Sequence, residues 1–343
     1  MKFDFVIGNP PYQENTEGTS DRPIYNLFMD AAYTVADDVM LITPARFLFD
    51  AGKTPKEWNQ KMLSDPHLKV LYHEQSSWKV FPNTDIKGGV AITYHSAGRD
   101  FGSIGAYSAF PELNTILHKV VKGDRFATVD DLIYQQNRWD LNALYSDYPE
   151  YRSVIGSGGT ERRLTTPIFS ALDVFTEEKH KDDLKILGLI KNKRFYKYIN
   201  RKYIDNQHGN LFKYKVIVPA SNGSGALGEV LATPLIGEPL IGEPLIGFTQ
   251  SFIAFGAFDT YDEAEAMLKY IKTKFSRTML GIIKVTQHNH KGTWKYVPLQ
   301  DFTPASDIDW SKSIPEIDQQ LYAKYGLDAE EINFIETHVK PMT

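Results

Sequence analysis

The chain has 343 residues, of which 42% are hydrophobic and 24% are charged, and its formal net charge is −5. This composition is typical of a globular protein that is long enough for two domains. The absence of cysteine excludes disulfides and thiolate metal sites, and no apolar run approaches the roughly 18 residues of a membrane span. The sequence also lacks the pattern of a signal peptide, so we expect a cytoplasmic location and no membrane partner.

The first element that we expect is a strand at 3–8, which stops at the tetrapeptide Asn9-Pro10-Pro11-Tyr12. Each proline removes a backbone donor, and the residue before each proline is biased towards extended backbone. The Asn9 side-chain oxygen and the Pro10 carbonyl can therefore both accept hydrogen bonds from an exocyclic amine, while the Tyr12 ring offers a face to a base. A plain strand-ending turn is the alternative, since Asn-Pro and Pro-Pro are common loop signals.

The rest of the first 155 residues alternates apolar strands with helical stretches, which predicts βαβ units and a mostly parallel sheet. Further strands are expected at 39–43, 68–73 and 89–94, and helices at 24–36, 55–63 and 111–121. The polar run GSGGT at 156–160 then predicts a domain boundary, because flexible polar stretches rarely cross a core.

After this run, aromatic and basic residues interleave, and basic charge is concentrated in islands. Residues 191–215 contain eight Lys/Arg and one Asp, and residues 266–300 contain seven Lys/Arg and no acid. Such islands suit contacts with phosphates. A strand is expected at 214–219, an extended loop at the repeat PLIGEPLIGEPLIG (234–247), and helices at 262–273, 314–325 and 329–339.

The tetrapeptide resembles the NPPY motif of amino-group methyltransferases that use S-adenosyl-L-methionine, and in particular the adenine-specific (N6) DNA methyltransferases of bacterial restriction-modification systems. The resemblance continues over most of the chain, in the following stretches: LITPARFLFDAG (41–52), VFPNTDIKGGVAITYHSAG (80–98), AFDTYDEAEAMLKYIKTKF (257–275) and KVTQHNHKGTWKYVPLQDF (284–302). The motif indicates methylation of an amine but not of DNA specifically, because methylases of protein glutamine and of RNA guanine also carry it.

The resemblance implies an α/β fold, in which a partial Rossmann-like methyltransferase sheet is followed by a mixed α+β target-recognition domain and terminal helices. We accordingly expect a catalytic part at 1–155, a DNA-binding target-recognition domain at 156–300 and a carboxyl-terminal helical segment at 301–343. Family members place a glycine-rich cofactor loop before the motif, and only eight residues precede Asn9. We therefore expect the cofactor-binding half to be missing, or to be supplied by a methyltransferase or restriction subunit, and the chain alone to be inactive.

A G-x-G-x-x-G run at 223–228 is the alternative place for a cofactor loop. The fingerprint requires a helix that opens at the loop, and the prolines at 234, 239 and 244 leave little room for one. We expect this run to turn the chain or to let its backbone approach DNA.

By resemblance, Asn9, Pro10, Pro11 and Tyr12 form the catalytic motif, which holds an adenine that has been flipped out of the duplex. Two acceptors would favour a more tetrahedral amine that attacks the methyl group of the cofactor, without a metal. Tyr12 is one expected stacking ring. The second expected stacking ring is Tyr94, which we take as an aromatic residue just after a strand. The alternative is that Tyr94 is a core tyrosine. Phe81 is then the substitute for the second ring.

Further candidate residues are basic. Arg46 and Lys87 are expected beside the base pocket as phosphate contacts, although either also fits a solvated surface charge. The main DNA contacts are expected at one helical face, with a solvated basic helix as the alternative. These residues are Lys193, Arg194, Lys197, Arg201 and Lys202. Residues 287–290 (QHNH) do not predict a metal site, because no cysteine or carboxylate lies nearby in the sequence.

The sequence thus predicts a site-specific adenine methyltransferase that acts on double-stranded DNA in a restriction-modification system. Two alternatives remain: a non-catalytic DNA-binding or specificity module, and a protein-glutamine or RNA amino-methyltransferase. DNA binding without affinity for S-adenosyl-L-methionine would favour the first, and methyl transfer to protein or RNA but not to DNA would establish the second.

Overall fold

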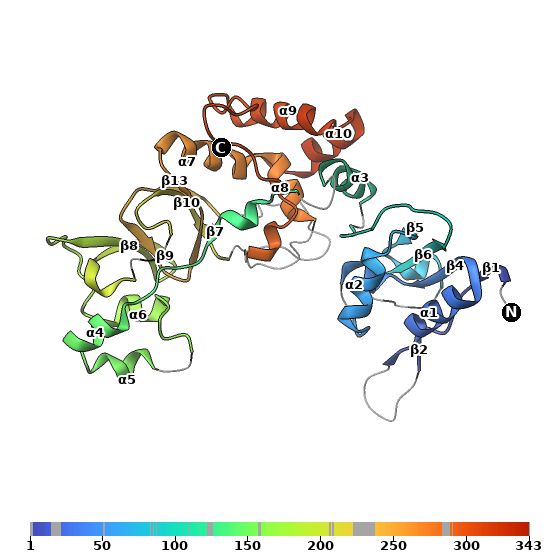
Figure 1. Cartoon of the computed structure of the whole chain (residues 1–343), viewed down its shortest axis with the longest axis horizontal. Helices are drawn as coiled ribbons and strands as arrows, with labels where there is room; N and C mark the ends of the chain where they lie inside the picture. The colour runs from blue at the N-terminus through green and yellow to red at the C-terminus, as the bar shows by residue number, and fades with distance from the viewer. Residues whose placement is uncertain are drawn as a thin grey trace. The chain divides into compact units, whose positions relative to one another are not determined.

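The computed structural model describes residues 3–14, 22–50, 52–82, 84, 86, 88–108, 110–121, 126–156, 159–205, 207, 209–221, 237–282, 289 and 291–342. They form two compact units, an amino-terminal unit (Met1–Asn114) and a carboxyl-terminal unit (Thr115–Thr343) (Figure 1). Several sheets and helices alternate along the chain, so the predicted mixed α/β class is confirmed.

The amino-terminal unit is built on a four-stranded sheet in the order β1-β4-β6-β5. The elements of this unit are β1 (Phe3–Gly8), β2 (Gln13–Glu14), β3 (Arg22–Pro23), α1 (Tyr25–Val35), β4 (Ala36–Pro44), η1 (Ala45–Phe49), α2 (Lys56–Ser64), β5 (Leu68–Glu74), η2 (Ser77–Lys79) and β6 (Val90–Ser96). The helix α3 (Pro111–Val120) spans the boundary between the units. The expected strands and helices of this region are thus present, with small differences at their ends.

The prediction of a mostly parallel sheet is wrong, because most of the strand pairs in this sheet are antiparallel. Only β1 and β4 pair in parallel, while β6 runs antiparallel to both of its neighbours, β4 and β5. The reason is the connection from β5 to β6, which contains the short helix η2 and turns and no crossover helix, so β6 returns against β5. It follows that β1, β4 and β5 run in one direction and end at the same edge, which we call the carboxyl edge of the sheet.

One face of this sheet carries the core. Val39 and Leu41 of β4 are buried against Met29 of α1, because alternate strand residues point to the same face. The opposite face is less covered: Phe5 and Ile7 of β1 lie in register with Asp38 and Met40, and their side chains are 47% and 73% exposed. The helices of this unit therefore cover only one side of β1.

The carboxyl-terminal unit contains two further sheets, in the orders β11-β10-β13-β7 and β12-β8-β9. Its strands are β7 (Ile133–Tyr134), β8 (Asp183–Ile190), β9 (Lys193–Asn200), β10 (Tyr214–Pro219), β11 (Leu240–Gly242), β12 (Ile246–Phe248) and β13 (Phe252–Phe258). Its helices are η3 (Val129–Leu132), α4 (Leu141–Asp147), α5 (Tyr151–Ile155), α6 (Thr166–Ala171), η4 (Arg201–Tyr203), α7 (Tyr261–Lys272), α8 (Lys274–Gly281), η5 (Lys291–Trp294), α9 (Ile314–Tyr325) and α10 (Ala329–His338).

The domain boundary that we expected between residues 155 and 156 does not separate two compact units. Leu144 of α4 and Tyr151 of α5 share one hydrophobic cluster with Phe169 of α6 and Leu184 of β8, so helices on both sides of this point bury their apolar faces together. The boundary at 300 and 301 is not a division either, because α9 packs on α7 and α8 (Figure 1). The functional assignment of these segments remains a prediction.

The helical face expected for residues 193–202 is wrong, since most of these residues form β9. β8 and β9 make an antiparallel hairpin whose two-residue turn is Lys191-Asn192, and both turn residues have positive φ values, 49° and 60°. Asparagine tolerates this left-handed conformation, which is the one that a type I′ hairpin turn requires. The basic residues therefore alternate between two faces of a strand.

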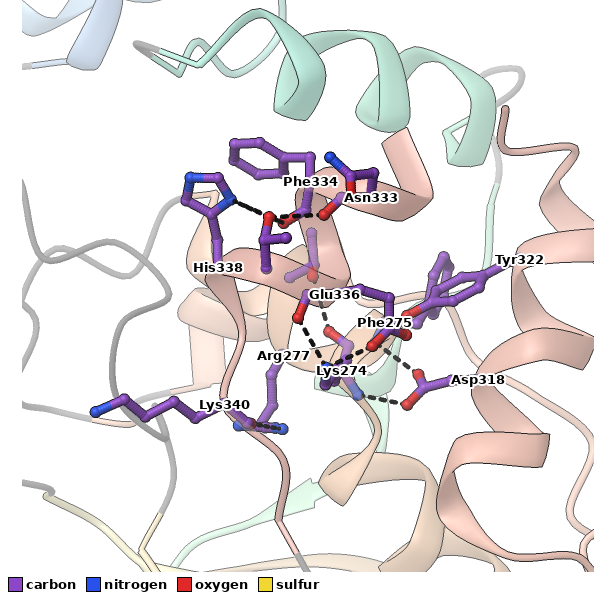
Figure 2. A network of polar contacts seen from close by, with 12 residues as sticks. Lys274, Phe275, Arg277, Asp318, Tyr322, Asn333, Phe334, Glu336, His338 and Lys340 are labelled. Atoms are coloured by element: carbon purple, nitrogen blue, oxygen red, sulfur yellow. Dashed lines mark hydrogen bonds and ion pairs between the residues drawn. The ribbon is translucent and has the colours of Figure 1, made fainter. Parts of the chain in front are cut away.

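The terminal helices are joined to α8 by a buried polar network (Figure 2). Asp318 of α9 is 2% exposed, and its two oxygens accept hydrogen bonds from the backbone N–H groups of Lys274 (3.0 Å) and Phe275 (2.9 Å). The Lys274 ammonium lies 2.5 Å from a carboxylate oxygen of Glu336 in α10, and the Tyr322 hydroxyl donates to the other oxygen at 3.0 Å. The backbone N–H groups in the first turn of a helix have no acceptor within that helix. Asp318, which lies in α9, thus supplies acceptors for two of these groups in α8.

Among the residues that the structure describes, no helix combines the length and the apolar character that crossing a membrane requires.

We predict that Asp318→Ala lowers the free energy of unfolding at neutral pH by about 1–3 kcal/mol, because it leaves one buried and one partly buried N–H group without acceptors. Urea unfolding of the full chain measures the loss. Glu330→Ala, an exposed position on α10, is the control and should change the stability by less than about 0.5 kcal/mol. Equal stability of both variants would contradict the role of Asp318.

The pH dependence of this loss also has a predicted sign. Burial raises the pKa of Asp318 to about 6, so the folded protein holds this proton more tightly than the unfolded chain does. The contribution of Asp318 to stability is therefore largest below its ordinary pKa and decreases as the pH rises to 6. The stability difference between the wild type and Asp318→Ala should be larger at pH 4 than at pH 7.

Candidate functional site

Three separate segments meet at the carboxyl edge of the amino-terminal sheet. Asn9 to Tyr12 follow the end of β1, Arg46 lies in η1 directly after β4, and Phe81 lies in the loop after β5. These three strands run in the same direction, so their carboxyl ends face the same side. Open α/β sheets bind ligands at this edge.

Tyr12 is held in place by its main chain and its ring. Its carbonyl accepts a hydrogen bond from the backbone N–H of Ile24 (3.1 Å), which ties the tetrapeptide to the start of α1. The Tyr12 and Phe81 rings lie edge to face, with 6.4 Å between their centroids. The Tyr12 hydroxyl is buried without a hydrogen bond to the described residues, and burial raises its pKa to about 12. Tyr12 is therefore a neutral ring at physiological pH.

The acceptors of the tetrapeptide are accessible. Asn9 and Pro11 are exposed and Pro10 is half-buried. Within the described part of the chain, the Asn9 side chain makes no hydrogen bond, and neither proline has a backbone donor. The turn thus offers an amide oxygen and a main-chain carbonyl beside an aromatic ring.

Tyr94 is not the second ring beside Tyr12. It lies inside β6, in register with Met40, and not after a strand as expected, because pairing with both β4 and β5 continues beyond it. Its hydroxyl donates to Asp38 (2.6 Å) near the amino end of β4, away from the carboxyl edge. The ring beside Tyr12 is Phe81, which the sequence offered only as a substitute.

Arg46 is exposed at the carboxyl edge, and two glycines make room for its side chain. A Cβ atom on Gly88 would lie 2.8 Å from Cγ of Arg46, and one on Gly52 would lie 3.3 Å from its Cβ. Both glycines have positive φ values, which side-chain-bearing residues rarely adopt. The guanidinium of Arg46 makes no ion pair with the described residues. Lys87, its expected neighbour, lies outside the described residues.

Two carboxylates near this edge already have partners. Asp50 accepts from the Asn59 amide (3.3 Å), and Glu74 accepts from the backbone N–H of Ser76 (2.9 Å) and lies 3.5 Å from the Lys79 ammonium. The hydrogen bond from Ser76 is the main reason why the pKa of Glu74 is lowered. These hydrogen bonds support the local fold.

In the carboxyl-terminal unit, the expected DNA contacts have different surroundings. Lys202 pairs with Asp147 (2.5 Å), the Arg201 guanidinium lies 4.8 Å from the centre of the Phe212 ring, and Lys197 donates to the Phe169 carbonyl (3.2 Å). Lys193 is exposed next to the β8–β9 turn, and Arg194 donates to the Glu238 carbonyl. The structure thus does not gather these five residues on one surface.

The residues 287, 288 and 290 of the QHNH segment lie outside the described residues. Asn289 is buried, and its amide donates to the Pro219 carbonyl (3.2 Å), so its role is structural. In the described ranges, no cluster of His, Asp and Glu side chains is arranged to hold a metal ion.

The sequence of this edge matches a known family. Residues 1–81, which carry the tetrapeptide, Arg46 and Phe81, match the model of the Eco57I restriction-modification methylases. An uncharacterized adenine-specific methylase of Mycoplasma pneumoniae is 30% identical over 95 residues. The resemblance to adenine-specific restriction-modification methylases is confirmed.

The extent of these matches is limited. The Mycoplasma match covers 26% of this chain and 22% of the methylase, so the chain spans about a fifth of that relative. Among solved structures, the Type IIL restriction-modification enzyme MmeI in complex with DNA is 8% identical with a TM-score of 0.33, covering 97% of this chain and 56% of that chain. That likeness is too distant to support a conclusion about this chain.

We predict that Gly89→Ala destabilises the protein by about 1–3 kcal/mol, because its backbone has a φ of 77° and a Cβ atom would collide with the Glu74 carbonyl. The Gly89 carbonyl also accepts from Ala45 (3.0 Å), so the strain would reach the residue before Arg46. Chemical denaturation measures the loss. Gly98→Ala is the control, because a Cβ atom there meets no atom within 4 Å; equal effects of the two changes would contradict the steric argument.

Proposed function

We propose that this chain supplies the adenine pocket and the target-recognition part of a DNA adenine methyltransferase in a restriction-modification system. The observation that carries the proposal is the accessible NPPY turn at the carboxyl edge of the sheet, within the segment that matches the methylase family. The substrate is an adenine in double-stranded DNA, and S-adenosyl-L-methionine is the methyl donor.

The geometry of the turn suits an exocyclic amine. An adenine amine has two N–H donors, and the Asn9 side-chain oxygen and the Pro10 carbonyl are both acceptors. The Tyr12 ring gives the flipped base a stacking surface, and Phe81 supports that ring from its edge. Two hydrogen bonds hold the amine in one orientation and raise the electron density on its nitrogen.

Arg46 fits a second role at the same edge. Its guanidinium makes no ion pair with the described residues, and Gly52 and Gly88 leave room along its stem. A base can leave the stack only if the backbone around it is held in a distorted form, which phosphate contacts stabilise. Arg46 is suited to bind a phosphate next to the flipped nucleotide.

The described residues do not fit a complete site for S-adenosyl-L-methionine. The carboxylates of Asp50 and Glu74 near the carboxyl edge have protein partners, and the G-x-G-x-x-G run at 223–228 lies outside the described residues. When bound, the donor supplies a sulfonium methyl group. We assign its binding to a further methyltransferase segment, in the same polypeptide or in a partner subunit.

The sheet itself supports such a segment. Among the described strands, β1 is at the edge of its sheet, and its Phe3, Phe5 and Ile7 residues are 52%, 47% and 73% exposed. An apolar edge strand of this kind is normally covered, because its free N–H and C=O groups and its apolar face favour pairing with another strand. A cofactor-binding segment that pairs with β1 would bring the donor to the NPPY turn.

The proposal predicts that Asn9→Ala and Tyr12→Ala each lower the rate of DNA methylation by at least about a hundredfold, because each change removes a group that holds the amine or the base. The measurement is transfer of labelled methyl groups to duplex DNA by the enzyme completed with its cofactor-binding segment. Binding of duplex DNA should remain within about threefold of the wild type, since most of the affinity comes from phosphate contacts.

Asn142→Ala, an exposed position in the carboxyl-terminal unit, is the matched control and should retain full activity. Equal loss of DNA binding in Asn9→Ala and Tyr12→Ala, with binding by Asn142→Ala unchanged, would show that the NPPY turn is only structural. Methyl transfer to RNA or protein but not to DNA would show that the substrate is not DNA. DNA binding without methylation by the completed wild type would identify a non-catalytic DNA-binding module.

A further inference from the structure

A cleft of about 790 Å³ lies within the carboxyl-terminal unit, and both polar and apolar residues line it. Five separate segments line it: the residues after β7, the residues before α6, the β8–β9 hairpin around its turn, the end of β10 and the start of β13. Its polar side chains are mainly amides and guanidiniums. They include Gln135, Gln136, Arg163, Asn192, Arg194 and Gln250.

These side chains match the edges of bases better than they match phosphates alone. Arginine forms paired hydrogen bonds with the O6 and N7 atoms of guanine, and glutamine or asparagine does so with N6 and N7 of adenine. Among the described residues that line the cleft there is no Asp or Glu, so none of these side chains repels a polyanion. A second recess in the same unit differs, since Asp140, Asp182 and Asp205 line it together with basic residues.

The charges of the two arginines are available to a ligand. In the described part of the chain, neither Arg163 nor Arg194 makes an ion pair. Arg194 donates to the main-chain carbonyl of Glu238 and lies 5.9 Å from the centre of the Phe252 ring. The Glu238 carboxylate pairs instead with Lys272, at 3.1 Å. Arg194 is thus oriented by neutral groups and not by a carboxylate.

The floor of the cleft is fixed by hydrogen bonds between its segments. The backbone N–H of Gln250 donates to Leu164 (2.9 Å), and the Ser251 and Thr166 hydroxyl groups lie 2.5 Å apart. The backbone N–H of Ala220 donates to the Ser251 carbonyl (2.8 Å). A surface that is fixed before binding loses little entropy when it binds, which favours discrimination between closely similar ligands.

The β8–β9 hairpin gives this surface a shape that fits DNA. The major groove admits a two-stranded β-ribbon, and the exposed Lys191 and Lys193 flank Asn192 at its turn. The lysines can contact the two rims of the groove while Asn192 and Arg194 face the bases.

We propose that this cleft is the base-reading surface of the protein and that Arg163 and Gln250 are specificity-determining residues, which contact purine edges in the major groove of duplex DNA. The inference rests on the proposed function and deepens it. It differs from the sequence-based expectation, because most of the basic residues expected to contact DNA lie elsewhere, and Lys202 is already paired with Asp147.

The test is selection of methylated duplexes from a randomised DNA library by the completed enzyme, followed by sequencing. Arg163→Ala and Gln250→Ala should each lower the discrimination at one or two base pairs by at least about tenfold, because each removes a contact with a base edge. Arg162→Ala is the matched control. Arg162 is the neighbouring exposed arginine, but it pairs with Asp205 (3.0 Å) outside the cleft, so its loss should leave the selected sequence unchanged.

The outcomes separate this inference from the proposed function. If the wild type methylates a defined sequence, and both variants select that sequence with unchanged discrimination, the cleft is not the reading surface and the methyltransferase function stands. Uniformly weaker binding to all sequences would assign Arg163 and Gln250 to phosphate contacts and overturn the inference. If the completed wild type methylates no DNA, the proposed function itself fails.

Discussion

The parallel pairing of β1 with β4 is the constraint on which the amino-terminal unit depends. Gly8 lies in register with Leu41, so the NPPY turn and η1 begin at the same edge of the sheet although more than thirty residues separate them in the chain. The alternation of buried Val39 and Leu41 fixes this register, because a shift by one residue would turn the core side chains of the strand to the other face. The positions of Asn9, Tyr12 and Arg46 follow from that register.

Within the described part of the chain, the same pairing leaves β1 with one bonded neighbour and one partly covered face. If the proposed cofactor-binding segment pairs with β1, this strand lies inside a larger sheet, which would cover the exposed Phe3, Phe5 and Ile7. Catalysis and cofactor binding would then be divided between two segments. In the proposed function, this chain would supply the pocket for the amine, while the methyl donor would arrive from the other side of β1.

In the carboxyl-terminal unit, the packing holds many polar side chains at fixed positions. Its hydrophobic cluster around Phe169 and Leu184 carries the β8–β9 hairpin, and the buried Asp318 joins the terminal helices to α8. Lys215 is one of these fixed side chains. Its buried ammonium donates to the Glu243 (3.3 Å) and Ile246 (2.9 Å) carbonyls, and burial lowers the pKa of Lys215 to about 7. The sequence had offered Lys215 as part of a basic island, yet it is not available to DNA.

The sequence by itself determined the local elements and the motif. The helix at 261–272 and the NPPY turn are visible in it, because hydrophobic periodicity and proline geometry act over a few residues. Only the tertiary structure decided that Phe81 and not Tyr94 lies beside Tyr12, and that residues 193–200 form a strand. Both outcomes depend on pairing between segments that are distant in the chain: β6 pairs with β4 and β5, and β9 pairs with β8. Such pairing is set by shared burial and register, which no local pattern of residues encodes.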